Sequence, residues 1–186
     1  MSVLTKFTLE QYEKMMEAGV FDGSEHGRLE FLRGEIVPMS PIGVPHARMV
    51  NILTHWSVKK ADESEVLVSV QNPILLPPND SAPEPDLAWV RVNKSDRHPQ
   101  PNDIFLIIEV ADTTLRLDTT TKATLYAEGG ITDYWVIDLI SEVVHVHRDP
   151  IDGQYRTITM ARKDDEVSPL AYPEAVLNVG EAFSKL

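Results

Sequence analysis

Residues 104–110 read IFLIIEV, an apolar run that is interrupted only by Glu109. Strands that are covered on both faces carry such continuous runs instead of an alternating pattern, so this stretch predicts the buried middle strand of a sheet. A buried carboxylate without a partner is costly. Glu109 therefore needs a partner, and a divalent cation shared with a second carboxylate is one that chemistry can use.

Asp86 supplies a second carboxylate at the edge of an apolar run. It stands directly before LAWV at residues 87–90, and the proline-rich loop at residues 77–85 leads to it. Prolines favour extended backbone in such a loop. The sequence therefore predicts a second strand that carries a carboxylate at its start.

A helical stretch lies between the Glu109 strand and the next strong strand, DYWVID at residues 133–138. Asp118 and the threonines that follow it favour a helix start, and a pair of glycines favours its end about three turns later. Lys122 and Tyr126 lie four residues apart on this predicted helix and share one face. The order of strand, helix and strand predicts a βαβ-like crossover.

The remaining elements follow from capping, turn and periodicity signals. We expect a helix opened by a capping box of Thr8 and Gln11, a hairpin of residues 29–32 and 35–37, a helix over about 46–60, strands at 66–70 and 74–76, and a second hairpin of residues 142–147 and 154–159. The sequence shows no repeat and no linker. It predicts one domain over residues 1–186 with an α/β or α+β fold.

Composition narrows the class of protein further. The chain has 186 residues and no cysteine, so it forms neither disulfides nor a thiolate zinc site. It has no apolar run of about 18 residues, and its amino terminus lacks the apolar core of a secretory signal. We expect a cytoplasmic protein with no membrane partner.

The net charge of −12 opposes a general attraction to nucleic acid, because phosphate binding depends largely on Lys and Arg contacts. A local basic face or bound metal cations would offset this average near a site. Candidates for such a face are Arg91, Lys94 and Arg97 after the Asp86 strand, and Lys59 with Lys60 at a helix end.

Two carboxylates and a lysine are sufficient groups for metal-dependent phosphodiester hydrolysis. Asp86 and Glu109 would bind Mg²⁺ or Mn²⁺, and Lys122 would orient a water or stabilise the negative charge that develops at phosphorus. The structural alternative is equally compatible with the spacing. In it, Asp86 is a turn residue, Glu109 pairs with an arginine and Lys122 is a solvated helix residue.

A family resemblance favours the first interpretation. The segments that carry it are Pro85–Asp86, Ile107–Val110, Asp118 with Lys122 and Tyr126, Gly129–Ile131 and Asp133–Asp138, preceded by Leu29–Ile36, Met39–Pro41 and His46. This set resembles the Uma-two family of restriction-endonuclease-like proteins, over roughly residues 8–137. The family belongs to the PD-(D/E)XK nuclease superfamily, so the resemblance implies a restriction endonuclease-like fold with a central four-stranded mixed sheet, flanking helices and, in this chain, additional β-hairpins.

The resemblance also implies roles for individual residues. It makes Asp86 the first metal-binding acid, Glu109 the second and Lys122 the catalytic lysine, which here follows on a helix instead of two residues after the acid, where Ala111 stands. Glu30 and His46 match recurrent family positions. Glu30 is expected to join the metal shell, either directly or through a water, whereas His46 is either a general base or a histidine bonded to backbone at a helix start.

Asp112 departs from the family pattern, which has a small hydroxyl residue there. It adds either another metal ligand or a charge that raises the pKa of Glu109. His145 and His147 alternate on a strand and offer an incomplete metal site, which would suit a small cupin-like metalloenzyme. Tyr134 and Trp135 are candidates for either base stacking or core packing.

The leading hypothesis is a Mg²⁺- or Mn²⁺-dependent endonuclease that acts on DNA. The rival hypothesis is a nuclease-fold protein that no longer cuts and serves as a binding or assembly module. A homodimer is expected for a protein that cuts both strands of a duplex symmetrically.

Overall fold

The computed structural model describes residues 5–22, 28–93 and 95–186. Its elements follow the chain as α1 (Leu9–Glu17), β1 (Leu29–Leu32), β2 (Glu35–Pro38), α2 (Val44–Lys60), β3 (Val66–Val70), η1 (Pro77–Asn79), β4 (Leu87–Arg91), η2 (Pro101–Asp103), β5 (Ile104–Ala111), α3 (Leu115–Leu117), η3 (Asp118–Lys122), α4 (Ala123–Glu128), β6 (Asp133–Asp138), β7 (Val143–Ile151), β8 (Gln154–Ala161), β9 (Glu166–Val167), β10 (Leu177–Asn178) and α5 (Val179–Phe183). None of the described helices is both long and apolar enough to cross a membrane.

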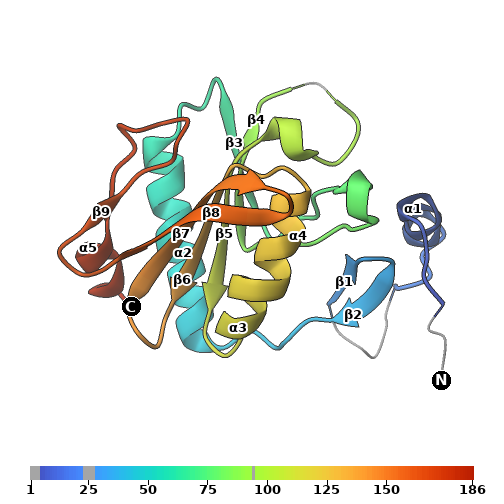
Figure 1. The fold of residues 1–186 in the computed structure, drawn as a ribbon, viewed down its shortest axis with the longest axis horizontal. Coiled ribbons are helices and arrows are strands. Elements are labelled where there is room, and N and C mark those ends of the chain that lie inside the picture. The colour runs from blue at the N-terminus through green and yellow to red at the C-terminus, as the bar shows by residue number, and fades with distance from the viewer. Residues whose placement is uncertain (1–4, 23–27, 94) are drawn as a thin grey trace.

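A six-stranded mixed sheet with strand order β3-β4-β5-β6-β7-β8 forms the centre of the structure (Figure 1). Strands β5 and β6 pair in parallel through the helical crossover, and the other neighbours are antiparallel. The expected mixed sheet and βαβ crossover are therefore confirmed. The sheet is wider than the expected four strands because the β7–β8 hairpin extends it.

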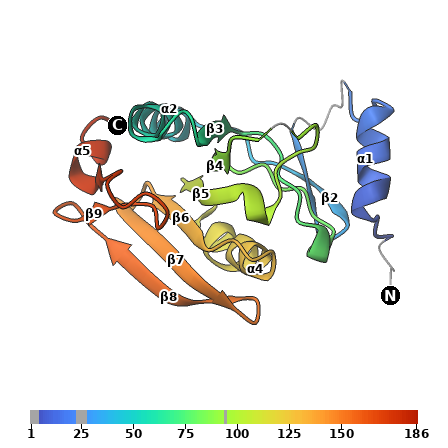
Figure 2. The same ribbon diagram turned by 90° about the horizontal axis from the view of Figure 1, so that it is seen from above.

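Strand β5 lies inside the sheet, and both faces of the sheet are covered. Figure 2 shows α2 on one face and α4 on the other. Seven of the eight β5 residues are buried, which confirms the interpretation of its continuous apolar run. The two faces bury separate apolar clusters, one with Leu106 and Ile108 and one with Ile107. A carboxylate on this strand is consequently withdrawn from bulk solvent.

Helix α2 begins two residues before the predicted start. Gly43 is its N-cap, and Pro45 fits in the first turn because the amides there have no helical partner. The expected apolar stripe is buried against the sheet, where Trp56 lies 5.3 Å from Trp89 and 5.9 Å from Trp135 between ring centroids. The packing places the first turn of α2 beside the strand ends that carry the acidic residues.

The crossover helix begins earlier than its capping signals indicated. It starts at Leu115, so Asp118 lies inside the helix and does not cap it. Residues 118–122 form a π-helical turn, and the carbonyl of Asp118 also accepts a 2.9 Å hydrogen bond from the Tyr134 hydroxyl. Such turns hold one extra residue and often occur at functional sites. The side chain of Lys122, which ends this turn, is buried.

The β1–β2 hairpin forms a separate two-stranded sheet, as predicted. Its Phe31 stacks on Tyr12 of α1 with centroids 4.4 Å apart, and the capping box of α1 is confirmed. Residues 74–76 were expected to form a strand, which is wrong. In the structure, Leu76 makes one isolated bridge to Ser81, and the amides of Ile74 and Leu75 bond to loop carbonyls.

Candidate active site

Asp86 and Glu109 lie together where the start of β4 meets the end of β5. Strands β4 and β5 are antiparallel, so the residue before β4 meets the end of β5. The Asp86 amide lies 3.4 Å from Oε2 of Glu109, and the Val110 amide donates a 2.9 Å hydrogen bond to Oδ2 of Asp86. Sheet pairing thereby brings together two carboxylates that are 23 positions apart in the sequence.

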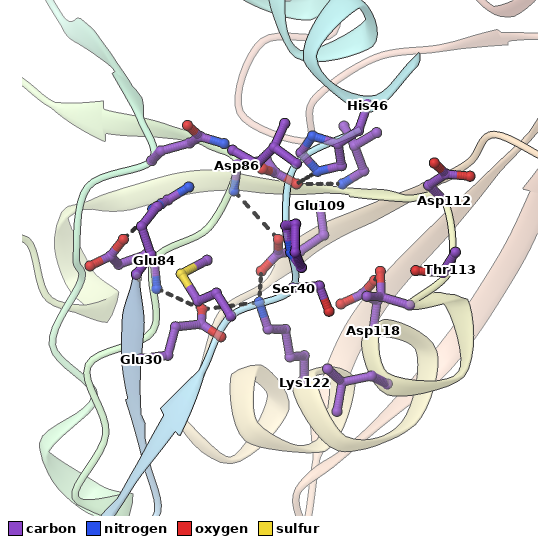
Figure 3. A pocket seen from close by; sticks show the side chains of 18 of the residues that line it. Glu30, Ser40, His46, Glu84, Asp86, Glu109, Asp112, Thr113, Asp118 and Lys122 are labelled. Carbon is purple, nitrogen blue, oxygen red and sulfur yellow. Dashed lines mark hydrogen bonds and ion pairs between the residues drawn. The ribbon is translucent and has the colours of Figure 1, made fainter. Parts of the chain in front are cut away.

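Lys122 reaches this pair from the crossover helix. Its Nζ donates hydrogen bonds of 3.0 Å to Oε1 of Glu109 and 3.1 Å to Oε1 of Glu30 (Figure 3). The side chains of all three residues are at most 7% exposed. The structural alternative, a solvated lysine and a Glu109 paired with arginine, is therefore wrong.

Glu30 comes from the separate hairpin. Besides the Lys122 contact, its Oε1 accepts a 2.9 Å hydrogen bond from the backbone amide of Glu84. The bridge between Phe31 and Ala82 fixes the hairpin against the loop that leads to Asp86. Lys122 thus joins the hairpin and the main sheet through two buried carboxylates.

His46 lies in the first turn of α2 and its Nε2 is 3.0 Å from Oδ2 of Asp86. It is not bonded to backbone, since the other ring nitrogen, Nδ1, has no partner in the described part of the chain. Burial by itself raises the pKa of Asp86, but His46, the Val110 amide and Gln71 together outweigh it, so the pKa of Asp86 is lowered. Asp86 is consequently ionised at neutral pH.

Glu109 has the opposite electrostatic environment. Burial raises its pKa to about 8 against the charge of Lys122, and the neighbouring Asp86, Asp118 and Glu30 add to the rise. The pKa of Lys122 is raised, because its three acidic neighbours outweigh the effect of burial. Two carboxylates at one site with pKa values shifted apart are typical of functional sites.

These residues border one cavity of about 230 Å³. Its charged and titratable lining consists of Arg28, Glu30, His46, Glu84, Asp86, Glu109, Asp112, Asp118 and Lys122. Figure 3 shows side chains from both carboxylate strands, the crossover helix, the hairpin and α2 around it. Burial also raises the pKa of Asp118 against the charge of Lys122. The lining therefore carries an excess of acidic groups.

Two further residues donate hydrogen bonds to the acidic pair. The sequence left the role of Tyr126 open and gave no indication of Gln71. Tyr126 donates a 2.8 Å hydrogen bond from its buried hydroxyl to Oε1 of Glu109, and its spacing to Lys122 was the available signal. Gln71 donates a 3.1 Å hydrogen bond from Nε2 to Oδ1 of Asp86. Nothing in the local pattern marked Gln71, because its role depends on how β3 pairs with β4.

Other candidates lie away from the cavity. His147 is buried between Tyr134 and Tyr155. Nε2 of His145 lies 3.9 Å from Oδ2 of Asp138. The open mixed sheet contradicts the cupin-like alternative. Tyr134 and Trp135 are fully buried, so the core interpretation holds for both and neither stacks on a base.

Two of the candidate basic residues after the Asp86 strand have partners of their own. The Arg91 guanidinium lies 4.6 Å from the centroid of the Phe105 ring, and Arg97 pairs with Asp103 at 2.8 Å. Lys94 lies outside the described residues. Lys59 and Lys60 are exposed at the end of α2.

The donor set fits a hydrated divalent cation better than an all-protein cage. Among the described residues, no group of three or more His, Cys, Asp or Glu side chains is arranged to hold a metal ion. Mg²⁺ commonly binds through one or two carboxylates and keeps several waters. Asp86 and Glu109 supply two carboxylates, the cavity has room for water, and a cation would offset the excess of buried negative charge.

Comparison with known proteins identifies the family and the fold of the chain. The sequence model of the Uma2 (Uma-two) family, described as "Putative restriction endonuclease", matches residues 9–180. A crystal structure described as "a putative nuclease" from Anabaena variabilis matches with a TM-score of 0.74 and 14% identity, over 96% of this chain and 98% of that chain. No protein with a curated description matches. The expected family is thus confirmed over a longer stretch than predicted, as is the fold.

Proposed function

Because this chain belongs to the Uma2 family, we propose that it is a metal-dependent endonuclease that hydrolyses phosphodiester bonds in DNA. The observation that carries this proposal is the convergence of Asp86, Glu109 and Lys122 on one cavity from three different elements. Their order in the chain and their chemical types suit phosphoryl transfer, in which catalysis depends on positioning and on stabilising negative charge.

Asp86 and Glu109 are the residues that would hold Mg²⁺ or Mn²⁺. A bound ion supplies Lewis acidity, which polarises a phosphoryl oxygen and acidifies a coordinated water. Asp86 suits this role because three donors, from His46, Val110 and Gln71, fix its ionised carboxylate. Glu109 suits it because Lys122 and Tyr126 both donate to Oε1, so Oε2 is the less occupied oxygen.

Lys122 would stabilise the negative charge that develops on the phosphorus oxygens, or hold the attacking water. Its pKa is raised, so it stays protonated and acts as a cation and hydrogen-bond donor. Glu30 shares the ammonium group with Glu109 and restricts its position. Since His46 bonds to Asp86, its role in this proposal is to orient that carboxylate.

DNA as the substrate has to be reconciled with the net charge of −12. Helix α2 offers a local surface for DNA that carries basic and no acidic side chains. It has no acidic residue in its 17 positions, and Arg48, His55 and Lys59 lie exposed along it. A duplex cut in both strands would require two copies of the chain or two successive events, so a homodimer is part of this proposal.

The test uses isosteric variants, which preserve packing in a buried site. Wild-type protein, Asp86→Asn, Glu109→Gln and Lys122→Met are incubated with supercoiled, linear duplex and single-stranded DNA in Mg²⁺ or Mn²⁺. The matched control is Tyr155→Phe, which removes a buried hydroxyl that bonds to Ile131 away from the cavity. Cleavage by the wild type and the control but not by the three site variants is expected.

Calorimetric titration with each ion separates catalysis from binding. Asp86→Asn and Glu109→Gln should lose metal affinity, whereas Lys122→Met should keep most of it. Far-ultraviolet circular dichroism and thermal unfolding establish that each variant is folded. A wild-type protein that binds neither ion and cleaves no DNA form would overturn the proposal and favour the rival binding module.

A further inference from the structure

Gln71 follows β3 in a backbone conformation that glutamine rarely adopts. Its φ is 52°, in the left-handed region that favours glycine. Six non-glycine residues in the described part of the chain have positive φ, and of these Gln71 alone lines the cavity. A glutamine in the left-handed region costs conformational free energy. Interactions with its surroundings must therefore hold Gln71 in this conformation beside Asp86.

Among the described residues, Gln71 donates two hydrogen bonds, and Asp86 accepts both. Its backbone amide donates a 3.2 Å hydrogen bond to the carbonyl oxygen of Asp86, and its Nε2 donates a 3.1 Å hydrogen bond to Oδ1 of the same residue. The other oxygen, Oδ2, is engaged by His46 and the Val110 amide. Gln71 is therefore the residue that restrains Oδ1 and stops the carboxylate from rotating about the bond to Cβ.

We infer that Gln71 is a positioning residue of the proposed metal site, whose left-handed backbone directs its carboxamide onto Asp86 so that the carboxylate is held ready for a divalent cation. This inference rests on the proposed function and adds a residue to it. Groups that orient metal ligands without touching the ion typically change metal affinity by about 10- to 100-fold when removed. A carboxamide suits the task because it is neutral and neither repels the cation nor competes for it as a charge.

The backbone conformation supplies a test that separates function from structure. Glycine is the residue best suited to φ of 52°, so Gln71→Gly removes the backbone strain and the carboxamide together. A residue with a purely structural role would leave metal affinity unchanged on this substitution. If Gln71 is a positioning residue, the Gln71→Gly variant should bind metal more weakly than the wild type. It should nevertheless unfold at the same temperature as the wild type or at a higher one.

Two further variants complete the design. Gln71→Asn keeps a carboxamide on a residue that tolerates the left-handed region, but its side chain is one methylene shorter and fails to reach Oδ1. Glu142→Gly is the matched control, since Glu142 has φ of 54° in the exposed turn between β6 and β7. It relieves the same kind of strain away from the cavity and should leave metal affinity at the wild-type value.

Titration calorimetry with Mg²⁺ and with Mn²⁺, together with thermal unfolding of the metal-free proteins, gives the result. Metal affinity about tenfold lower or more in Gln71→Gly and Gln71→Asn, with no loss of melting temperature in Gln71→Gly, is expected. Wild-type affinity in both Gln71 variants would overturn this inference and leave the proposed function standing. A wild-type protein that binds neither ion would overturn both.

Discussion

The hydroxyl of Tyr126 donates a 2.8 Å hydrogen bond to Oε1 of Glu109, and both side chains are buried. Burial raises the pKa of Tyr126 well above its usual value, so the hydroxyl remains a donor at all accessible pH values. The contact joins the crossover helix to the central strand at the point where the proposed chemistry takes place. It should therefore contribute to stability, and under the proposed function it should also fix Glu109 for metal binding.

Tyr126→Phe should lower the free energy of unfolding by about 1–3 kcal/mol, because it leaves a buried carboxylate oxygen with one donor fewer. It should also weaken DNA cleavage, since Glu109 is less well fixed. Tyr155→Phe loses a comparable buried hydroxyl at Ile131 and should cost similar stability without affecting cleavage. Urea unfolding and a cleavage assay on both variants make the comparison, and equal cleavage would contradict the role of Tyr126.

Lys122→Met should be among the most destabilising substitutions in the chain, by about 3–5 kcal/mol at neutral pH. It removes the ammonium group that bonds to Glu109 and Glu30, which leaves the buried Glu30 carboxylate without a countercharge and Oε1 of Glu109 without one of its two hydrogen-bond donors. Adding Glu109→Gln and Glu30→Gln to Lys122→Met should recover much of the loss, because no unpaired charge remains among the three.

Chemical denaturation at pH 7 measures this recovery. The exposed pair of Lys14 and Glu10 on α1 is the control, and Lys14→Met should have little effect because solvent screens that pair. A triple variant no more stable than Lys122→Met would show that unpaired carboxylates are not the cause of the lost stability.

His147 should make the protein less stable in acid. Burial lowers its pKa from 6.5 to about 4, so the folded state resists a proton that the unfolded chain accepts. This effect is absent above pH 6.5 and grows to about 3 kcal/mol of destabilisation as the pH falls to 4. The raised pKa of Glu109 acts in the opposite sense, because it lowers stability as pH rises from 4.5 to about 8.

The difference between wild type and His147→Gln isolates the histidine, since Glu109 contributes equally to both. The stability of the wild type should fall relative to the variant between pH 6.5 and 4. Urea unfolding at half-unit pH steps provides the curves. A constant difference across that range would show that His147 is protonated as readily in the folded state as in the unfolded one.

DNA affinity should depend on the exposed face of α2. Arg48→Ala and Lys59→Ala should each weaken binding of a duplex without metal and reduce the slope of log affinity against log salt by about 0.9. Lys163→Ala, at an exposed position in the loop after β8, should leave both unchanged. Fluorescence anisotropy over a salt series measures the slopes. If Arg48→Ala and Lys59→Ala behave like the control Lys163→Ala, the DNA contacts lie elsewhere on the protein.

The proposed metal carboxylates could be found from sequence because each interrupts or borders an apolar run. Local patterns also predicted the hairpin, the capping box of α1, the stripe of α2 and the parallel crossover. Capping signals misplaced the start of the crossover helix, where Asp118 is packed inside a π-helical turn and its carbonyl accepts a hydrogen bond from Tyr134. The apolar pattern of residues 74–76 predicted a strand, although these residues have no strand partner among the described residues.

The sequence by itself determined which segments are buried and therefore which acidic residues needed a partner. Only the tertiary structure decided who those partners are. Glu30 is 92 positions from Lys122, and Gln71 is 15 positions from Asp86, so no local period relates them. Hydrophobic burial follows from the order of apolar residues along a segment, whereas hydrogen bonds between side chains depend on sheet register and on how separate elements pack.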